Sequence, residues 1–226
     1  MTDFLEYAED EHAYYKNGVA IPSVTQILKH AGLVSPYMMD AEAAWRGQQV
    51  HEITAKDDIE RVDMRTITER FRPYLRAWRA FRRDTGFSVT EVEARVDSPD
   101  GGGYAGRCDR IGYLPQRPNG HIMLDIKTGV PPSYAHLQTA AYAHAHNPQL
   151  PWLRMVVALS NLGTYNVKTY PFKDYFTDRD RWLILVGEYH KAKMENKNER
   201  SDTDSSEEHG AGGIGSVDAA GGSHSA

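Results

Sequence analysis

The sequence places charged side chains inside two apolar stretches that otherwise have the composition of β-strands. Asp109 lies in the first stretch, 104–114, and Asp125 lies in the second, 121–127, two residues before Lys127. Side chains two residues apart on a strand point to the same face, so Asp125 and Lys127 face the same way. Burying these groups is costly unless they neutralise one another or hold a cation. The spacing therefore indicates a polar site near the middle of a small sheet.

A hairpin followed by a helix would position these groups. The stretches 104–114 and 121–127 predict two strands, and the Pro, Asn and Gly of 115–120 predict the turn between them. The simplest pairing is antiparallel. The helix that follows carries Gln138 and Tyr142, which are four residues apart and so share a helical face.

Two helices are predicted before this hairpin. Ser23 and Gln26 have the spacing of a capping box, so one helix begins there. A second helix is expected over 40–59, with Gly47 and His51 on one face. Gly47 would let another backbone or a nucleic-acid strand approach this face closely.

A third helix is predicted in the arginine-rich stretch 64–85. Arg72, Arg76 and Arg79 recur at three- and four-residue steps opposite an apolar set, and Pro73 suits the first turn. Most such charged stripes are solvated helix faces. The preference for arginine and the scarcity of acids on this face also suit contacts to phosphate.

The remaining pattern completes an α/β fold. Three further strands are predicted, over 88–96, 152–160 and 165–171. The first of them carries Glu93, and a last helix is expected to be capped by Thr177 or Asp178. The sequence therefore predicts a central mixed sheet of about five strands flanked by helices.

The expected domain organisation is simple. Residues 1–20 form an N-terminal arm, 21–195 form one domain whose first part, 21–86, is helical, and 196–226 form a tail. The tail is rich in Ser, Gly, Ala and acids and is expected to be disordered, because it cannot bury enough apolar surface to offset its ordering entropy.

The composition excludes several classes of protein. The 226 residues include 40% hydrophobic residues, which suffices for a sizeable core. One cysteine rules out a disulfide framework and fits a reducing cytosol, and neither a signal peptide nor a membrane span is visible. The net charge of −5 argues against a uniformly basic nucleic-acid binder, although a local basic channel remains open.

Other residues that could do chemistry have simpler interpretations. His136, His144 and His146 do not form a zinc motif, and we expect three exposed helix histidines. Cys108 has no histidine at a matching spacing, so a nucleophilic role is not expected.

Taken in order, several of these residues resemble the PD-(D/E)XK nuclease superfamily. The resembling set is His51, Glu93, Asp109, Asp125 to Lys127 and Gln138 to Tyr142. The nearest likeness is to the RecB-type branch, especially the mitochondrial genome maintenance exonucleases and their phage relatives. The stretches 21–28 (IPSVTQIL) and 46–52 (RGQQVHE) resemble N-terminal signatures of that group, so the resemblance covers roughly residues 20–195.

The resemblance implies a restriction-endonuclease-like core with a Mg²⁺ or Mn²⁺ site. Asp109 and Asp125 are the first expected ligands, followed by Glu93 and the carbonyl of Ile126. His51 would be a further ligand or a contact to phosphate near the same site. The iron–sulfur members of the branch need four cysteine ligands, and with one cysteine this chain is not expected to hold a cluster.

The resemblance also assigns roles in DNA cleavage. Lys127, acting with Asp109 and Asp125, would orient or help deprotonate the attacking water. Gln138 and Tyr142 would contact DNA or support the residues that do. Independently of the resemblance, the composition of the third helix makes its arginines candidates for contacts to phosphate, with a solvated face as the alternative.

The expected function is metal-dependent hydrolysis of DNA in replication, recombination or repair. The resemblance favours an exonuclease acting on single-stranded or end-bearing DNA in a bacterial or phage-infected cytosol. A single-strand annealing or replication partner would then act in trans. Two alternatives are a non-catalytic nucleic-acid-binding or regulatory module on the same fold, and a protein-interaction adaptor. The acids and Lys127 argue against the first, because carboxylates facing phosphate do not help binding.

Overall fold

The computed structural model describes residues 5–8, 13–34, 40–99 and 103–207 of the chain. The chain divides into two compact units, Met1–Tyr189 and His190–Ala226. Every strand in the described residues lies in the first unit. No helix in the described ranges is both long enough and apolar enough to cross a membrane.

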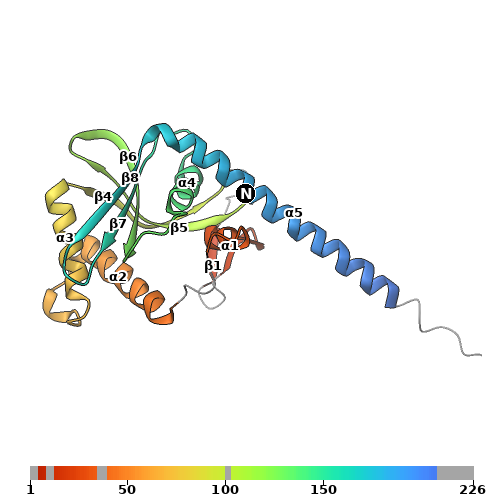
Figure 1. The fold of residues 1–226 in the computed structure, drawn as a ribbon, viewed down its shortest axis with the longest axis horizontal. Helices are drawn as coiled ribbons and strands as arrows, with labels where there is room; N and C mark the ends of the chain where they lie inside the picture. Colours follow the sequence, from red (N-terminus) through yellow and green to blue (C-terminus); the bar gives the residue numbers. More distant parts are fainter. Residues whose placement is uncertain (1–4, 9–12, 35–39, 100–102, 208–226) are drawn as a thin grey trace, which may run out of the picture. The chain divides into compact units, whose positions relative to one another are not determined.

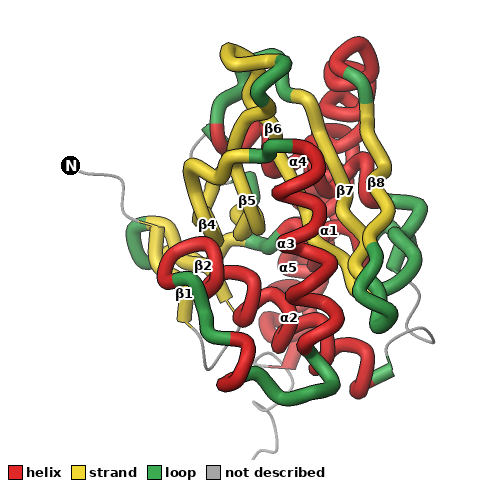
Figure 2. Tube along the Cα trace, turned by 90° about the vertical axis from the view of Figure 1, so that its left-hand side faces the viewer, coloured by secondary structure: helices red, strands yellow, loops and turns green. Residues whose placement is uncertain are grey.

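A five-stranded mixed sheet forms the centre of the first unit. Its strands lie side by side in chain order (Figure 2): β4 (Ser88–Asp97), β5 (Ala105–Leu114), β6 (Arg117–Thr128), β7 (Leu153–Leu159) and β8 (Tyr165–Tyr170). Neighbouring strands are antiparallel except β6 and β7, which are parallel. Because parallel strands need a crossover, the chain passes through α4 (Ala135–His146) between them. The predicted mixed sheet is confirmed.

Helices cover both faces of this sheet. One face carries α2 (Ala41–Glu60) and α3 (Arg72–Thr85), and the other carries α1 (Val24–His30), α4 and the start of α5 (Tyr175–Glu207), as Figure 1 shows. The alternation of β6 explains the division of the core. Leu124 and Ile126 pack against α2 and α3, whereas Met123 packs on the other side. The sheet is therefore buried on both faces, and charged groups within it need partners.

The N-terminal residues form a small sheet of their own. It consists of β1 (Leu5–Ala8), β2 (Ala13–Lys16) and β3 (Val19–Ile21), all antiparallel. Lys16 Nζ lies 2.5 Å from Asp97 Oδ2 on β4, and Ala105 N donates to the Pro22 carbonyl at 2.9 Å. The described residues of the predicted arm are thus ordered strands attached to β4 and β5.

Local sequence signals fix the helix starts. Ser23 Oγ accepts from Gln26 N at 3.1 Å while Ser23 N donates to Gln26 Oε1 at 2.7 Å, which is the predicted capping box. Pro73 lies in the first turn of α3, as expected.

Three local predictions are wrong. The turn between β5 and β6 is shorter than 115–120, because Leu114 already pairs with Arg117. Asp178 lies inside the first turn of α5, where it binds the buried Arg154 at 2.7 Å instead of serving as the cap. His144 is buried and its Nδ1 lies 2.9 Å from the Tyr104 hydroxyl.

Helix α5 runs to Glu207, past residue 196, where the tail was expected to begin. The rest of the predicted tail, 208–226, lies outside the described residues.

Candidate active site

The candidate site lies where β5 and β6 stop pairing. Their ladder ends at Arg110 and Leu124, while β6 continues beside β7 as far as Thr128. The side chain of Asp109 bridges the opening, because its Oδ2 accepts a hydrogen bond from the Ile126 N–H at 2.6 Å. The separation of the strands thus creates space within the sheet, and Asp109 is fixed at its edge.

His51 reaches Asp109 from α2. Its Nδ1 lies 3.2 Å from Asp109 Oδ1, so the two carboxylate oxygens have different partners. Burial opposes ionisation of Asp109. The charge and hydrogen bond of His51, the charge of Lys127 and the Ile126 N–H outweigh burial and lower the pKa of Asp109 to about 2. Asp109 is therefore a carboxylate at neutral pH.

Glu93 approaches from β4 with an unusual backbone. Its φ is 51°, in the left-handed region that non-glycine residues seldom adopt. Its Oε1 lies 3.1 Å from Arg110 Nη1, and its Oε2 lies 3.0 Å from Arg107 Nε. Burial, followed by the charge of Asp109, raises the pKa of Glu93. A strained backbone held by two arginines thus keeps a second carboxylate near the first.

His51, Glu93 and Asp109 form a suitable set of metal ligands. One potential ligand atom from each residue lies within 4.8 Å of the other two. Two carboxylate oxygens and one imidazole nitrogen suit a hard divalent cation such as Mn²⁺ or Mg²⁺, with water completing the shell. The donor atoms and their spacing therefore fit the cation that the sequence predicts.

Asp125 lies outside this three-residue cluster and is paired with Lys127. The Nζ of Lys127 lies 2.8 Å from Asp125 Oδ2, and the predicted common face of the two side chains is present. Burial raises the pKa of Asp125, although Lys127 opposes this shift. Burial disfavours the charged form of Lys127, but Asp125 and Asp109 outweigh it and raise the pKa of Lys127. The pair therefore holds an ammonium beside Asp109.

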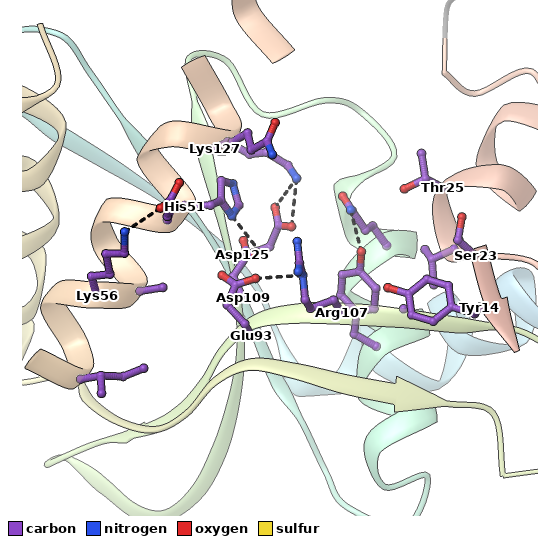
Figure 3. A pocket seen from close by; sticks show the side chains of 18 residues that line it. Tyr14, Ser23, Thr25, His51, Lys56, Glu93, Arg107, Asp109, Asp125 and Lys127 are labelled. Atoms are coloured by element: carbon purple, nitrogen blue, oxygen red, sulfur yellow. Dashed lines mark hydrogen bonds and ion pairs between the residues drawn. The ribbon is translucent and has the colours of Figure 1, made fainter. Parts of the chain in front are cut away.

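These groups line a pocket of about 550 Å³. In Figure 3, His51 and Lys56 enter from α2 on one side, and Tyr14 and Thr25 lie on the other. The small N-terminal sheet and the start of α1 therefore contribute to the wall. The carboxylates of Glu93, Asp109 and Asp125 are among the residues that line this pocket.

Gln138 and Tyr142 lie on the pocket wall, on the side of the helix that the resemblance implies. Gln138 Nε2 donates to the Tyr142 hydroxyl at 3.0 Å. Gly106 on β5 makes room for the ring, since a Cβ there would lie 2.6 Å from Tyr142 Cε1. The structure thus brings these two residues together with His51, Glu93, Asp109, Asp125 and Lys127.

The arginines of α3 are not among the lining residues of this pocket. Arg79 binds Asp57 of α2, with Nε 3.0 Å from Oδ1. Arg72 donates to the Ile67 carbonyl at 2.9 Å, and Arg76 is exposed. Their proposed contacts to phosphate stay a prediction, and at least two of them have intramolecular partners.

The sequence alone did not single out three residues near the site. Arg107 and Arg110 bind Glu93, and the buried Asp58 of α2 binds Arg110 with an Nε–Oδ2 distance of 2.5 Å. Arg110 could have been suspected, because it stands beside Asp109 in an apolar strand. Asp58 gave no local signal, since its partner is 52 residues away along the chain. The assignment of the Ile126 carbonyl as a metal ligand stays a prediction.

Comparison with known proteins adds one finding. Residues 27–205 match the family model described as the PD-(D/E)XK nuclease superfamily. No curated protein matches the chain. The matched range is well over half of the 226 residues and includes β4 to β8 and the candidate ligands.

Proposed function

Because the chain belongs to the PD-(D/E)XK nuclease superfamily, we propose that it hydrolyses phosphodiester bonds of DNA with Mg²⁺ or Mn²⁺ as cofactor. One observation carries the proposal: His51, Glu93 and Asp109 converge within 4.8 Å, next to the Asp125–Lys127 pair, in an open pocket. A site of only structural importance would not need these charges beside a cavity. Glu93, Asp109 and the Asp125–Lys127 pair lie on the adjacent strands β4, β5 and β6, and His51 lies on α2.

The side chains divide the work of cleavage. When bound, the cation supplies positive charge to the scissile phosphate and favours ionisation of a nearby water. His51, Glu93 and Asp109 would hold this cation, and Asp125 would bind it or keep Lys127 in position. Lys127 would orient the attacking water and stabilise the negative charge that develops on the phosphate.

The pKa of Lys127 favours the positioning role over that of a base. Asp125 and Asp109 raise its pKa in the metal-free protein, so Lys127 is an ammonium there. An ammonium donates hydrogen bonds and cannot accept a proton. Orientation and charge stabilisation are therefore the roles that this group can perform without first losing its proton.

The finer assignments rest on the sequence resemblance. We propose membership of the RecB-type branch and an exonuclease that degrades single-stranded or end-bearing DNA during replication, recombination or repair. Residues 21–195 would form the nuclease domain. The single buried cysteine fits a reducing cytosol, and a partner that anneals or replicates DNA would act in trans.

A cleavage assay tests this function directly. End-labelled single-stranded DNA, linear duplex and covalently closed circles would be incubated with Mg²⁺, Mn²⁺ or EDTA. We expect either metal to support degradation of one of the end-bearing substrates, EDTA to prevent it, and the circles to survive. DNA binding without cleavage in any metal would contradict the nuclease proposal. Cutting of closed circles would instead contradict the exonuclease assignment.

A further inference from the structure

Arg107 differs from the other arginine that holds Glu93. Its Nε lies 3.0 Å from Glu93 Oε2, and its side chain is 50% exposed on the pocket wall (Figure 3). Arg110 holds the other oxygen and is fully buried. Glu93 therefore has two cationic partners, of which Arg110 is buried and Arg107 is accessible to solvent.

Arg110 is fixed by several further contacts. Its Nε lies 2.5 Å from Asp58 Oδ2, its Nη2 donates to Thr54 Oγ1 at 3.1 Å, and its Nη1 donates to the Asp109 carbonyl at 2.5 Å. Moving Arg110 would leave the buried Asp58 with less compensation, which is costly. Within the described chain, Arg107 contacts no carboxylate other than Glu93. Of the two arginines, Arg107 can leave at the lower cost.

A cation at the cluster would compete with Arg107 for Glu93. Both oxygens of Glu93 face guanidinium groups, so a metal ion that takes one of them must displace an arginine or crowd it. Like charges close together repel, and the exposed Arg107 can move into solvent. Metal binding therefore favours release of Arg107.

The charge balance of the site points in the same direction. Four carboxylates and four cations balance one another in this ion-pair network: Glu93, Asp109, Asp125 and Asp58 against Lys127, Arg107, Arg110 and Arg82. A divalent cation would therefore leave positive charge in excess. An anion then becomes the favourable partner for a freed guanidinium.

We propose that Arg107 serves two anions in turn, holding Glu93 in the metal-free protein and binding a phosphate of the DNA strand once metal occupies Glu93. This inference rests on the proposed binding of metal and DNA at the site. A guanidinium suits this exchange, because its planar fork pairs with carboxylate and phosphate alike. Arg107 would then contribute to DNA affinity only when metal is present.

Binding of a short single-stranded DNA, measured in EDTA and in Ca²⁺, tests the exchange. The variants are Arg107→Gln and, as a matched control, Arg117→Gln, whose exposed arginine lies on β6 away from the pocket lining. We expect Arg107→Gln to weaken binding roughly tenfold in Ca²⁺ and less than about twofold in EDTA. Arg117→Gln should behave alike in both conditions. Thermal melting of each variant checks that the fold is intact.

A second pair of variants mimics the metal-bound state without metal. Glu93→Gln should free Arg107 and strengthen DNA binding in EDTA by several-fold. In the double variant E93Q/R107Q this gain should disappear. A gain that persists in the double variant would overturn the proposal, because it would not depend on Arg107.

The remaining outcomes are also decisive. An equal loss for Arg107→Gln in EDTA and in Ca²⁺ would show a permanent phosphate contact, and no loss in either would show no contact; both overturn the exchange. Wild-type cleavage in Mn²⁺ is measured in parallel. If the metal-dependent loss of binding occurs but the wild type never cleaves, the exchange stands and the nuclease function fails.

Discussion

Asp109 combines a structural and a chemical role in one carboxylate. Its Oδ2 accepts from the Ile126 N–H where the β5–β6 ladder ends, and its Oδ1 faces His51 and the candidate metal cluster. An unpaired backbone N–H inside a sheet is costly. The same side chain thus allows the strands to separate and supplies a ligand in the opening.

Replacement of Asp109 should therefore reduce stability as well as activity. Its pKa of about 2 means that the surroundings favour the carboxylate overall, so Asp109→Ala loses this stabilisation and leaves the Ile126 N–H unsatisfied. We expect a loss of about 1–3 kcal/mol in the free energy of unfolding for Asp109→Ala, and a smaller loss for Asp109→Asn, which retains an acceptor. Urea unfolding in EDTA measures both. An alanine variant as stable as the wild type would contradict this structural role.

Ionisation of the buried Tyr175 hydroxyl should destabilise the folded protein in alkali. Burial raises its pKa to about 12, against the opposing charges of Arg179 and Arg154, and its hydroxyl has no hydrogen-bond partner among the described residues. The folded pKa lies above the ordinary value of about 10. The contribution of Tyr175 to the free energy of unfolding is therefore fully present below pH 10 and is lost as the pH rises toward 12.

Tyr175→Phe should remove this dependence. We expect the phenylalanine variant to match or exceed wild-type stability at pH 7 by up to about 1 kcal/mol, since an unpaired buried hydroxyl is lost. Its stability should fall less between pH 10 and 11.5. Tyr113→Phe, at a tyrosine that is 40% exposed, is the control. Identical alkaline unfolding of wild type and Tyr175→Phe would refute the assignment.

At the scale of elements, α3 binds α2 through its arginines. Arg79 pairs with Asp57, and Arg82 pairs with the buried Asp58, with an Nη1–Oδ1 distance of 2.5 Å. The stripe that suggested phosphate contacts from sequence is therefore partly an interhelical ion-pair network. Arg76 remains exposed and suits contact with DNA.

Single substitutions in α3 should separate the two roles. Arg79→Gln should reduce stability by about 2–3 kcal/mol, because Asp57 is only 5% exposed and would lose its partner. Arg76→Gln should leave stability unchanged and lower the slope of log affinity for DNA against log salt by roughly 0.7–0.9. A salt slope unaffected by Arg76→Gln would make this face of α3 a solvated surface.

Elements with strong local signals were predictable from sequence, and elements shaped by distant contacts were not. The capping box at Ser23 and Gln26 involves neighbouring residues, and the strand pattern around Asp125 and Lys127 reports burial directly. The left-handed backbone at Glu93 depends on packing that sequence spacing does not encode.

The candidate site shows the same division. Asp109, Asp125 and Lys127 are visible as charges in apolar strands, whereas Glu93 and His51 are predicted from the resemblance. Arg107 and Arg110 were not assigned to Glu93, and Arg110 is held in place by Asp58, which is far away in sequence. The contribution of Tyr14 to the pocket wall likewise arises from the folding of the N-terminal sheet.

At the scale of the whole molecule, the first unit contains every residue of the candidate site. It covers Met1–Tyr189, and the second unit begins within α5. A site confined to one unit does not require the residues that follow. The boundary of the nuclease domain near residue 195 stays a prediction.

Removal of the residues after Asn196 should therefore leave the enzyme nearly unchanged. We expect metal-dependent cleavage within about twofold of wild type and a melting temperature within about 2 °C, because the removed residues include few large apolar side chains that could contribute to a core. Differential scanning calorimetry and the cleavage assay measure the two quantities. A marked fall in melting temperature would place the domain boundary further along the chain.

The central claim is that Lys127 acts on the reaction and not on binding alone. Its ammonium is held 2.8 Å from Asp125, beside the metal cluster, where it would add little to metal affinity. Its useful interaction is with charge that develops in the transition state. Lys127 therefore separates an enzyme from a binding module more sharply than any of the carboxylates.

Single-turnover cleavage by Lys127→Ala, measured beside DNA binding in Ca²⁺, tests this claim most directly. We expect DNA affinity within a few-fold of wild type and a cleavage rate lower by a factor on the order of 10² or more. A collapse of affinity with a normal rate in the remaining complex would make Lys127 a DNA clamp and contradict the proposed chemistry.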